Sequence, residues 1–472
     1  MHLSSANMAL TRSLLLAGTI ILTSCASPQR TEEVVASPPI IATHVHEEKL
    51  ENPATSAIQT VSLEQKFTGA SSASIGANPG LPELLNRALT YHPEIRAAGF
   101  ERRARQAEVL QASRVPNPEF ETELENFAGN GGFSGFEGSE TTLAVSQTIE
   151  LGGKRQKRTE EAIKHTRVAA FDVETKRLEV FQDTAQRFYQ VLAAQEELKV
   201  TASMLSSARR LEQEVNTRVR AGRANILEQQ RVKLISSRAK VTHDQARFRL
   251  SNSLRALASV VNLPVTGLKS VKGNLFKVSH PLAETVLRSH LPDNPRAGSA
   301  AAEVARRQAA LARVRSERIP DLSLTAGTRF DQESNDRAFV ASIGLPLPIF
   351  NRNKGAIAAA EARVNQGIFE QQAQNIGLET LFTEHYSALV STAQQTLTLR
   401  KELIPAARLN FQTTNRAFQR GGIDLVSLIS SQQTISQLEL EAVRSAAQYQ
   451  MSRIALESLL GRSVTSSHKT AQ

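Results

Sequence analysis

The stretch from Lys154 to Arg220 contains no proline and no glycine, and its apolar residues recur at the alternating spacing of three and four that marks one face of a helix. This stripe consists of Phe171, Leu178, Phe181, Ala185, Phe188 and Leu192. At about 1.5 Å of rise per residue, the helix would be roughly 100 Å long. Such a rod is longer than a compact domain needs, and its stripe requires an antiparallel partner of its own length.

A second stretch of the same length, Lys354 to Arg420, predicts a second rod. Its seam keeps an unbroken spacing of four and three through Leu378, Phe382, His385, Leu389, Thr392, Thr396, Leu399 and Leu403. We expect His385 to be a packed residue of this seam rather than a ligand. Two shorter predicted helices, Leu81 to Arg114 and Asn225 to Ser259, together match one rod if they are stacked end to end.

The order of elements occurs twice, with an offset of about 200 residues, which predicts a duplicated unit. Each unit contains a helix, a hairpin, a rod, a glycine turn and a returning helix. The first repeat, 81–280, has its hairpin at 118–150, its rod at 154–220 and its returning helix at 225–259. The second repeat, 281–472, has the same elements at 320–348, 354–420 and 425–461.

In both hairpins the apolar period changes from helical spacing to two, over strands of about ten residues. That is the length a tilted strand needs to cross a bilayer, whereas no apolar run approaches the roughly 20 residues of a spanning helix. Four strands cannot close a barrel, because the smallest membrane barrels use about eight and an unpaired edge cannot face lipid. The chain is therefore expected to oligomerise, and two, three or four copies remain possible.

Four acidic residues of the first hairpin share one strand face, opposite Phe120 and Leu124. They are Glu119, Glu121, Glu123 and Glu125. Lipid cannot hold such charges, so we expect these residues to line a pore. Two readings stay open: an acidic wall that favours cations, or a lumen that is merely polar.

The amino terminus predicts where the protein is located in the cell. Arg12 precedes an apolar run and the small residues before Cys25, so 1–24 resembles a lipoprotein signal peptide whose cysteine is acylated. An ordinary signal peptide with an incidental cysteine is the alternative. Ala26 follows the cysteine, which by resemblance to bacterial lipoproteins favours the outer membrane. Residues 25–80 read as a flexible tether, and the sequence does not decide whether its His44 and His46 bind metal.

Composition excludes several classes of function. The net charge of +10 could suggest nucleic acid, but Arg and Glu are interspersed along the helices and no aromatic and basic platform occurs. No zinc-binding helix, phosphate-binding glycine loop or nucleophile elbow is found, so we expect neither an enzyme nor a cofactor, and we assign no metal site. The four methionines argue against a soft-ligand copper or silver path.

Five motifs carry a resemblance to a known family: ALTYHPEIRAA, SQTIELGGKR, RAGRANILEQQ, LPLPIFNRNKG and RGGIDLVSLISSQQ. From Leu81 to Gly461 the chain resembles the TolC-like outer-membrane efflux proteins. The resemblance implies a mixed α+β membrane protein, a homotrimer in which four strands per chain build a twelve-stranded outer-membrane barrel and the helices continue it as a periplasmic barrel. Loops 128–139 and 331–337 would then face the outside of the cell.

The resemblance also assigns roles to the two glycine turns. They would meet a periplasmic adaptor protein through Arg220, Gly222, Arg223, Arg420, Gly421 and Gly422. Family members often carry gating acids one and two turns past the second tip, where this chain has Ser427 and Ser430. The nearest acids, Glu228 and Asp424, complete the gate candidates.

The run from Gln147 to Arg155 looks like the cobalt-zinc-cadmium resistance branch of the family. The predicted function is therefore the passive exit duct of a tripartite system for divalent heavy-metal cations, driven by an inner-membrane pump of the resistance-nodulation-division type. Two alternatives are a duct for drugs or other organic solutes, and a periplasm-spanning structural lipoprotein without a channel.

Overall fold

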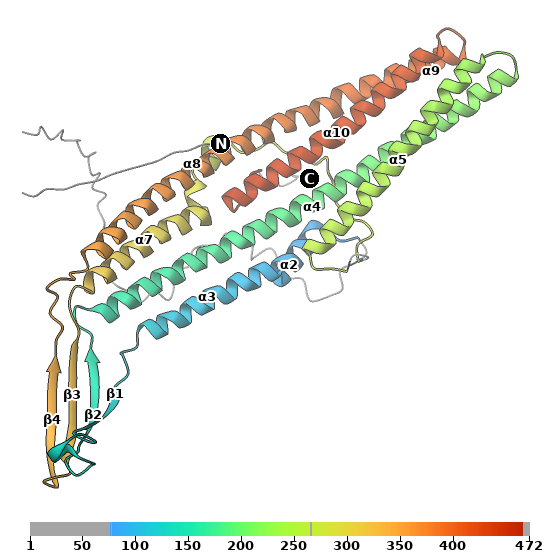
Figure 1. Ribbon diagram of the computed structural model, residues 1–472. Coiled ribbons are helices and arrows are strands. Elements are labelled where there is room, and N and C mark those ends of the chain that lie inside the picture. The colour runs from blue at the N-terminus through green and yellow to red at the C-terminus, as the bar shows by residue number, and fades with distance from the viewer. Residues whose placement is uncertain (1–75, 77, 265–266, 466–472) are drawn as a thin grey trace, which may run out of the picture. The chain divides into compact units, whose positions relative to one another are not determined.

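The computed structural model describes residue 76, residues 78–264 and residues 267–465; Cys25, His44 and His46 lie outside these ranges. The first repeat contains α2 (Leu81–Tyr91), α3 (Pro93–Ala112), β1 (Glu119–Glu125), the short η1 (Gly131–Phe133), β2 (Glu140–Ile149), α4 (Lys154–Arg220) and α5 (Ile226–Val260), drawn in Figure 1. No described helix is both long and apolar enough to cross a membrane.

The second repeat has the same order of elements, but it begins with two short helical segments. It contains α6 (Glu284–Arg288), η2 (Leu291–Asp293), α7 (Pro295–Ser316), β3 (Leu322–Asp331), β4 (Asp336–Gly344), α8 (Lys354–Thr398), the π-helical turn η3 (Leu399–Leu403), α9 (Ile404–Gln419) and α10 (Leu425–Leu460). In both repeats a proline starts the helix before the hairpin. His92 caps α3 by accepting from the Glu94 N–H, and Asn294 caps α7 by accepting from the Arg296 N–H.

The long helix α4 has different partners along its two halves. Near its start, the Arg158 guanidinium donates to the carbonyl of Ala112, the last residue of α3, at 3.0 Å. In its second half, Glu197 accepts two hydrogen bonds from the guanidinium of Arg249 on α5, at 2.7 and 3.0 Å. Two shorter helices thus cover one rod in succession, and Figure 1 shows both beside α4.

The second rod is not the unbroken helix that its spacing predicts. Pro405 has no N–H to give to an α-helical bond, and the turn before it, η3, widens to π spacing. One extra residue rotates the seam, so that Ile404 (8% exposed) follows Leu399 (2%) in the core, while Leu403 is 44% exposed. The prediction that Leu403 belongs to the seam is therefore wrong.

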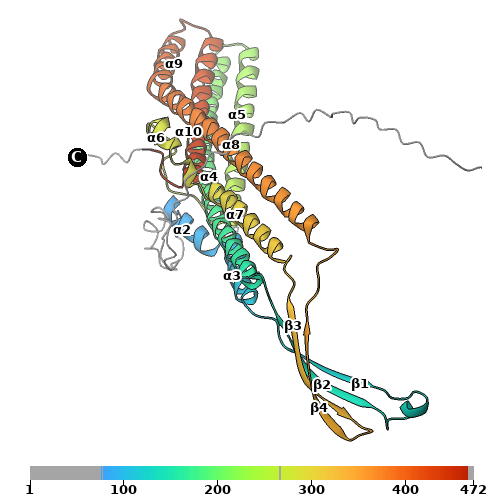
Figure 2. The ribbon, with the colours of Figure 1, turned by 90° about the vertical axis from the view of Figure 1, so that its left-hand side faces the viewer.

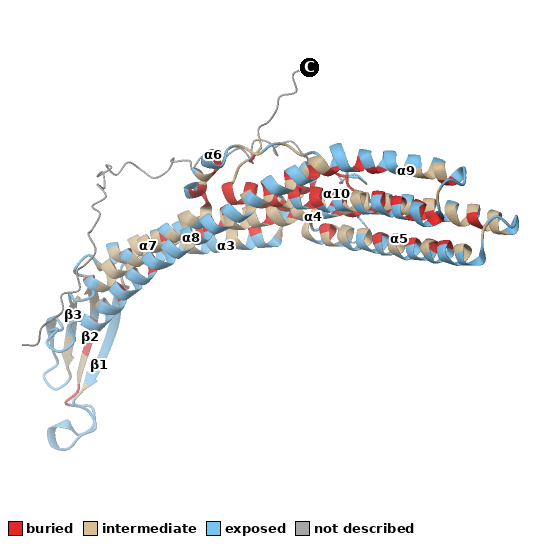
Figure 3. Cartoon of the chain, turned by 90° about the horizontal axis from the view of Figure 1, so that it is seen from above, coloured by how far each residue is buried: buried red, intermediate tan, exposed pale blue. Residues whose placement is uncertain are grey.

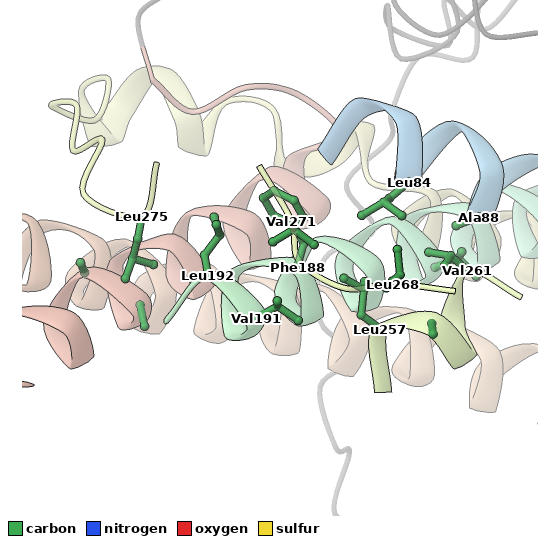
Figure 4. Packing of buried hydrophobic residues seen from close by; sticks show 14 of the residues in the cluster. Leu84, Ala88, Phe188, Val191, Leu192, Leu257, Val261, Leu268, Val271 and Leu275 are labelled. Carbon is green, nitrogen blue, oxygen red and sulfur yellow. The ribbon is translucent and has the colours of Figure 1, made fainter. Parts of the chain in front are cut away.

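The largest apolar core lies where α2, α4, α5 and the segment after α5 meet. Figure 4 shows Phe188 and Leu192 of α4 packed with Leu84 of α2 and with Val271 and Leu275 of the connector, the segment after α5. The amide of Gln195 fixes this connector by bonding both the N–H and the carbonyl of Val271. The irregular segment after α5 is therefore part of the core.

A buried polar network lies beside this core, at the end of α10. Arg453 donates to the hydroxyl of Tyr189 on α4 at 2.8 Å and to the carboxylate of Glu457 at 3.1 Å. The Tyr449 hydroxyl accepts from the Ser279 N–H and donates to the Ser279 carbonyl. Burial raises the pKa of Glu457 above its usual value, although Arg453 opposes this shift.

The two hairpins form a single antiparallel sheet in the order β1-β2-β3-β4, because β2 pairs with β3 (Figure 2). Two strands are shorter than expected. β1 has seven residues rather than about ten, since Asn126 and Ala128 have positive φ and leave the extended conformation. β4 ends at Gly344, although the alternation continues to Leu347 in the sequence.

Candidate functional site

The pairing of the strands collects polar residues on one face of the sheet. Glu121 lies opposite Ala144, which pairs with Gly327, and Glu123 lies opposite Thr142, which pairs with Arg329. The close approach of β2 and β3 explains why residue 327 is a glycine, because a Cβ atom there would lie 2.3 Å from the Leu143 carbonyl oxygen. All four glutamates predicted to line a pore share this face, and their exposure permits contact with solvent.

The polar face is not purely acidic. At its loop end one row brings together four carboxylates, those of Glu125, Glu140, Asp331 and Asp336. Arg329 stands beside this row, 2.9 Å from Glu140 and 3.7 Å from Glu125. The prediction of four glutamates did not include this arginine, whose place on the face follows only from the register between β2 and β3. Its guanidinium neutralises part of the acidic row.

The opposite face of the sheet is apolar and exposed. Phe120, Val145, Phe339 and Ile343 all point away from the polar face, and none of them is covered by another described part of the chain. Most of the sheet is pale blue or tan in Figure 3, in contrast to the red core of the helices. A large exposed apolar surface of this kind marks contact with lipid or with another protein.

The two glycine turns have the same backbone geometry. At the first, the N–H of Gly222 bonds the Val219 carbonyl and the N–H of Arg223 bonds the Arg218 carbonyl. At the second, Gly421 bonds Phe418 and Gly422 bonds Ala417 in the same pattern. This is the Schellman motif, which needs a left-handed residue, and the φ angles of Gly222 and Gly421 are +70° and +76°.

The two tips pack against each other through a small apolar cluster. Its fully buried members are Val215, Val232, Phe418, Leu425, Leu428 and Ile429. Arg218 covers this cluster, with its guanidinium 4.3 Å from the ring centre of Phe418, and pairs with Glu214 at 2.8 Å. The predicted tip residues Arg220, Arg223 and Arg420 are exposed around the cluster. Arg218 was not among the predicted residues.

Of the four gate candidates, Asp424 is the one that caps a helix. Asp424 caps α10 by accepting from the Ser427 N–H at 3.0 Å, and hydrogen bonds from Ser427 hold the pKa of Asp424 below its usual value. Glu228 lies in the first turn of α5, where Asn225 caps its N–H at 2.9 Å. Ser427 and Ser430 are exposed.

Within the described ranges, no group of three or more His, Cys, Asp or Glu side chains could hold a metal ion. His385 is half-buried and lines a cavity of about 240 Å³ with Glu179 and Arg296. Glu179 already pairs with Lys176 at 2.8 Å and with Arg296 at 3.0 Å. The carboxylate of this cavity is therefore neutralised by two cations.

Two known proteins are similar to this chain over most of its length. The chain is 26% identical to the cobalt-zinc-cadmium resistance protein CzcC of Cupriavidus metallidurans over 366 residues, which cover 78% of this chain and 86% of that protein. It is 22% identical to the pyoverdine export outer membrane protein OpmQ of Pseudomonas putida over 413 residues, or 82% of this chain and 86% of the relative.

The fold also matches a solved structure, the CmeC outer membrane channel of Campylobacter jejuni, with a TM-score of 0.69 and 16% identity over 89% of this chain and 95% of that chain. The sequence pattern of outer membrane efflux proteins matches residues 84–263 and 286–462, one stretch in each repeat. The chain therefore belongs to the outer membrane efflux protein family.

Proposed function

We propose that this protein is the exit duct of a tripartite efflux system, which conducts divalent heavy-metal cations across the outer membrane without an energy source of its own. The observation that carries the proposal is the two-faced sheet. One face is polar and rich in carboxylates, the other is apolar and exposed, and the outer edges of β1 and β4 have no described strand beside them.

The unpaired edges of β1 and β4 indicate that several copies of the chain assemble. Backbone groups at a strand edge cannot stay unpaired in lipid, so β1 of one copy has to pair with β4 of the next. Three copies would supply twelve strands, which is the homotrimer that the sequence resemblance implies. The apolar face would then contact lipid, and Glu119, Glu121, Glu123 and Glu125 would line the lumen.

The choice of metal cations rests on two supports. The relative from Cupriavidus metallidurans carries cobalt, zinc and cadmium resistance in its name, and the acidic row of the sheet would attract cations to the lumen. Deleting the gene should lower the tolerance of the cells to zinc, cobalt or cadmium. Unchanged tolerance to all three ions would contradict the choice of substrate, but not the duct.

A second candidate is a duct for organic solutes. The relative from Pseudomonas putida is named for the export of pyoverdine, and Arg329 weakens the acidic character of the lumen face. The same deletion strain separates the two candidates. Lower tolerance to drugs, with unchanged tolerance to the metals, would favour this second function.

In the proposed assembly the loops 128–139 and 331–337 face the outside, the two tips lie in the periplasm, and an acyl chain on Cys25 adds an anchor. The tips would contact an adaptor that links the duct to a resistance-nodulation-division pump. Of the gate candidates, Asp424 offers the sharpest test. Asp424→Asn removes the charge but keeps a good cap, whereas Asp424→Ala removes both.

Planar bilayers test the duct directly. The purified protein should show a cation-selective pore, and Asp424→Asn should raise the fraction of time for which the pore conducts. Comparing the thermal unfolding of Asp424→Ala with that of Asp424→Asn shows what loss of the cap adds to loss of the charge. If neither the parent nor the Asp424→Asn variant conducts, the duct is refuted.

A further inference from the structure

A groove of about 370 Å³ lies over α4, between α5 and α10. From α4 it is lined by Ala193, Ala194 and Glu197, whereas Phe188 and Leu192 belong to the core with α2 and the connector. Successive residues of a helix turn by about 100°, so the groove and this core lie on opposite faces of α4. The two alanines leave space between the flanking helices. The volume falls within the range of about 300–1,000 Å³ that is typical of small-molecule sites.

Helix α10 forms one wall of the groove with a single stripe of side chains. At positions i, i+3, i+4, i+7 and i+11, which share one face of a helix, stand Leu440, Val443, Arg444, Ala447 and Met451. Arg444 is the one charged member of this stripe, and it is exposed. Among the residues that the structure describes, Arg444 has no ion pair and its side chain has no hydrogen-bond partner. An unpaired guanidinium therefore stands in an otherwise apolar wall.

The other two charges of the groove cancel each other. Among the described residues that line it, Glu197 is the one carboxylate, and the guanidinium of Arg249 donates to this carboxylate at 2.7 and 3.0 Å. Two arginines and one glutamate leave a net charge of +1, which belongs to Arg444. A guanidinium binds a carboxylate through two parallel hydrogen bonds, and such bonds are stronger where apolar groups exclude water. The groove therefore favours an anion over a cation.

Neighbouring copies leave the groove open in the proposed ring. Copies in a ring meet at the edges of their helix layers, and near the tips those edges are α5 and α9 (Figure 3). The groove lies within the layer, over α4, on the face opposite to α2 and the connector. Because α2 and the connector would obstruct the duct if they lay inside it, the groove opens to the lumen in this assembly.

We propose that this groove binds an organic anion with one carboxylate and an elongated apolar body. The carboxylate bonds Arg444, and the apolar body lies along Ala447 and Met451. Met451 comes seven residues after Arg444, or about 10 Å along the helix, which suits a medium-chain fatty acid such as octanoate. The inference goes beyond the proposed function, because it concerns an organic ligand of the helical wall and shares with that function only the ring of copies.

Three small molecules of the same chain length test the charge rule on the full-length protein. The probes are octanoate, octylammonium and the uncharged octanamide, and isothermal titration calorimetry measures their binding to the protein in an uncharged maltoside detergent. Titration into the detergent alone gives the background of each probe. We expect octanoate to bind saturably, with one site per chain, and to bind more tightly than octanamide and octylammonium. Equal affinity for octanoate and octylammonium would overturn the proposal.

Substitution of Arg444 should remove this preference. Arg444→Gln loses the charged hydrogen bonds and should weaken octanoate binding by about tenfold or more. Arg444→Glu should favour octylammonium over octanoate. The matched control is Lys233→Gln, at an exposed cation of α5 that lies sixteen residues before Arg249, or about 24 Å along the helix, and it should bind octanoate like the parent. Unchanged octanoate binding by Arg444→Gln would refute the site.

The apolar part of the groove has its own test. Ala193→Leu places a larger side chain in the groove and should weaken octanoate binding severalfold, while circular dichroism shows unchanged helix content. Binding of octanoate by Ala193→Leu with the affinity of the parent would contradict the assigned position of the apolar body. Light scattering measures the number of copies in each variant. A change of that number in Arg444→Gln would show that the groove is covered by a second copy, and would also overturn the proposal.

Failure of the anion site and failure of the duct are distinguishable. A parent protein that conducts in bilayers but does not bind octanoate refutes only the anion site. A parent protein that binds octanoate through Arg444 but does not conduct refutes only the duct.

Discussion

Single charged residues have different consequences on the sheet and among the helices. On the sheet, Glu121 and Glu123 are exposed and have no ion pair among the described residues, so their charges act on the surrounding solution. Among the helices, Glu303 of α7 bonds Arg306 at 2.7 Å and Arg307 at 2.9 Å. These two arginines continue to Glu161 of α4 and Glu370 of α8, so this carboxylate supports packing between helices.

Removing two charges from the polar face should weaken cation preference. Glu121→Gln with Glu123→Gln leaves the strand pairing intact, because these side chains bond no backbone. We expect the reversal potential in a salt gradient to move towards zero by several millivolts. Thr122→Ser, between them on the opposite face, is the control for folding. An unaltered reversal potential would count against an acidic lumen.

The network at Glu303 predicts a dependence of stability on pH. The bond from Arg306 lowers the pKa of Glu303 below its ordinary value of 4.5, so the stabilisation is complete above that value and is lost as the pH falls through the lower pKa of the folded state. Glu303→Gln should therefore lower the melting temperature more at pH 7 than at pH 3. Glu137→Gln, at an exposed loop carboxylate, is the control. An equal loss at both pH values would refute the assignment.

At the scale of elements, the sequence predicts where helices end better than how they continue. The ends are marked by local chemistry that acts wherever it occurs: Pro116 and Pro320 stop helices, and Asn225 and Asp424 cap the returning ones. The spacing of apolar residues predicted the seam of the second rod only as far as Leu399. Pro405 was the signal for the change, and a count of apolar spacing does not register it.

Other features lacked any local signal. The connector after α5 has no periodicity, because each of its apolar residues packs on a different helix. The contact between Arg453 and Tyr189 joins residues 264 positions apart, and the place of Arg329 beside Glu140 depends on which strands pair. Such contacts are set by the tertiary arrangement and cannot be read from neighbouring residues.

The shift of the seam at η3 can be measured by three alanine substitutions. Leu399→Ala and Ile404→Ala each remove a buried side chain, which should cost about 2–5 kcal/mol of stability. Leu403→Ala, one residue before Ile404, should change stability by no more than about 0.5 kcal/mol because its side chain is exposed. Thermal unfolding of the three variants compares them. Equal destabilisation by Leu403→Ala would mean that the helix continues without the wide turn.

Gly421 and Gly422 of the second tip are a matched pair for testing the left-handed turn. Gly421 has a φ of +76°, which costs an L-residue about 1–2 kcal/mol, whereas Gly422 has no positive φ. Gly421→Ala should therefore lower the melting temperature, and Gly422→Ala should leave it nearly unchanged. A Cβ atom at Gly421 meets no other atom within 4 Å, so backbone strain alone would cause the difference. Equal melting temperatures would exclude the left-handed turn.

At the scale of the whole molecule, the sheet and the helices both end in surfaces that one chain cannot cover. The sheet has free edges at β1 and β4, and near the tips α5 and α9 are the outer helices of their layer. Strand edges need another strand, which a further copy of the sheet provides.

Chemical cross-linking tests whether β1 and β4 meet between copies. Cys25 is the only cysteine of the chain, so introduced cysteines can be followed without interference from a natural pair. Thr122→Cys on β1 and Phe339→Cys on β4 share one row of the apolar face but stand at opposite edges of the sheet. A flexible bis-maleimide added to the double variant should give covalent dimers and trimers on denaturing gels, and each single variant should give neither. Because two linked edges per copy close a ring of three, a ladder that continues past the trimer, or the absence of any linked species, would contradict the proposed assembly.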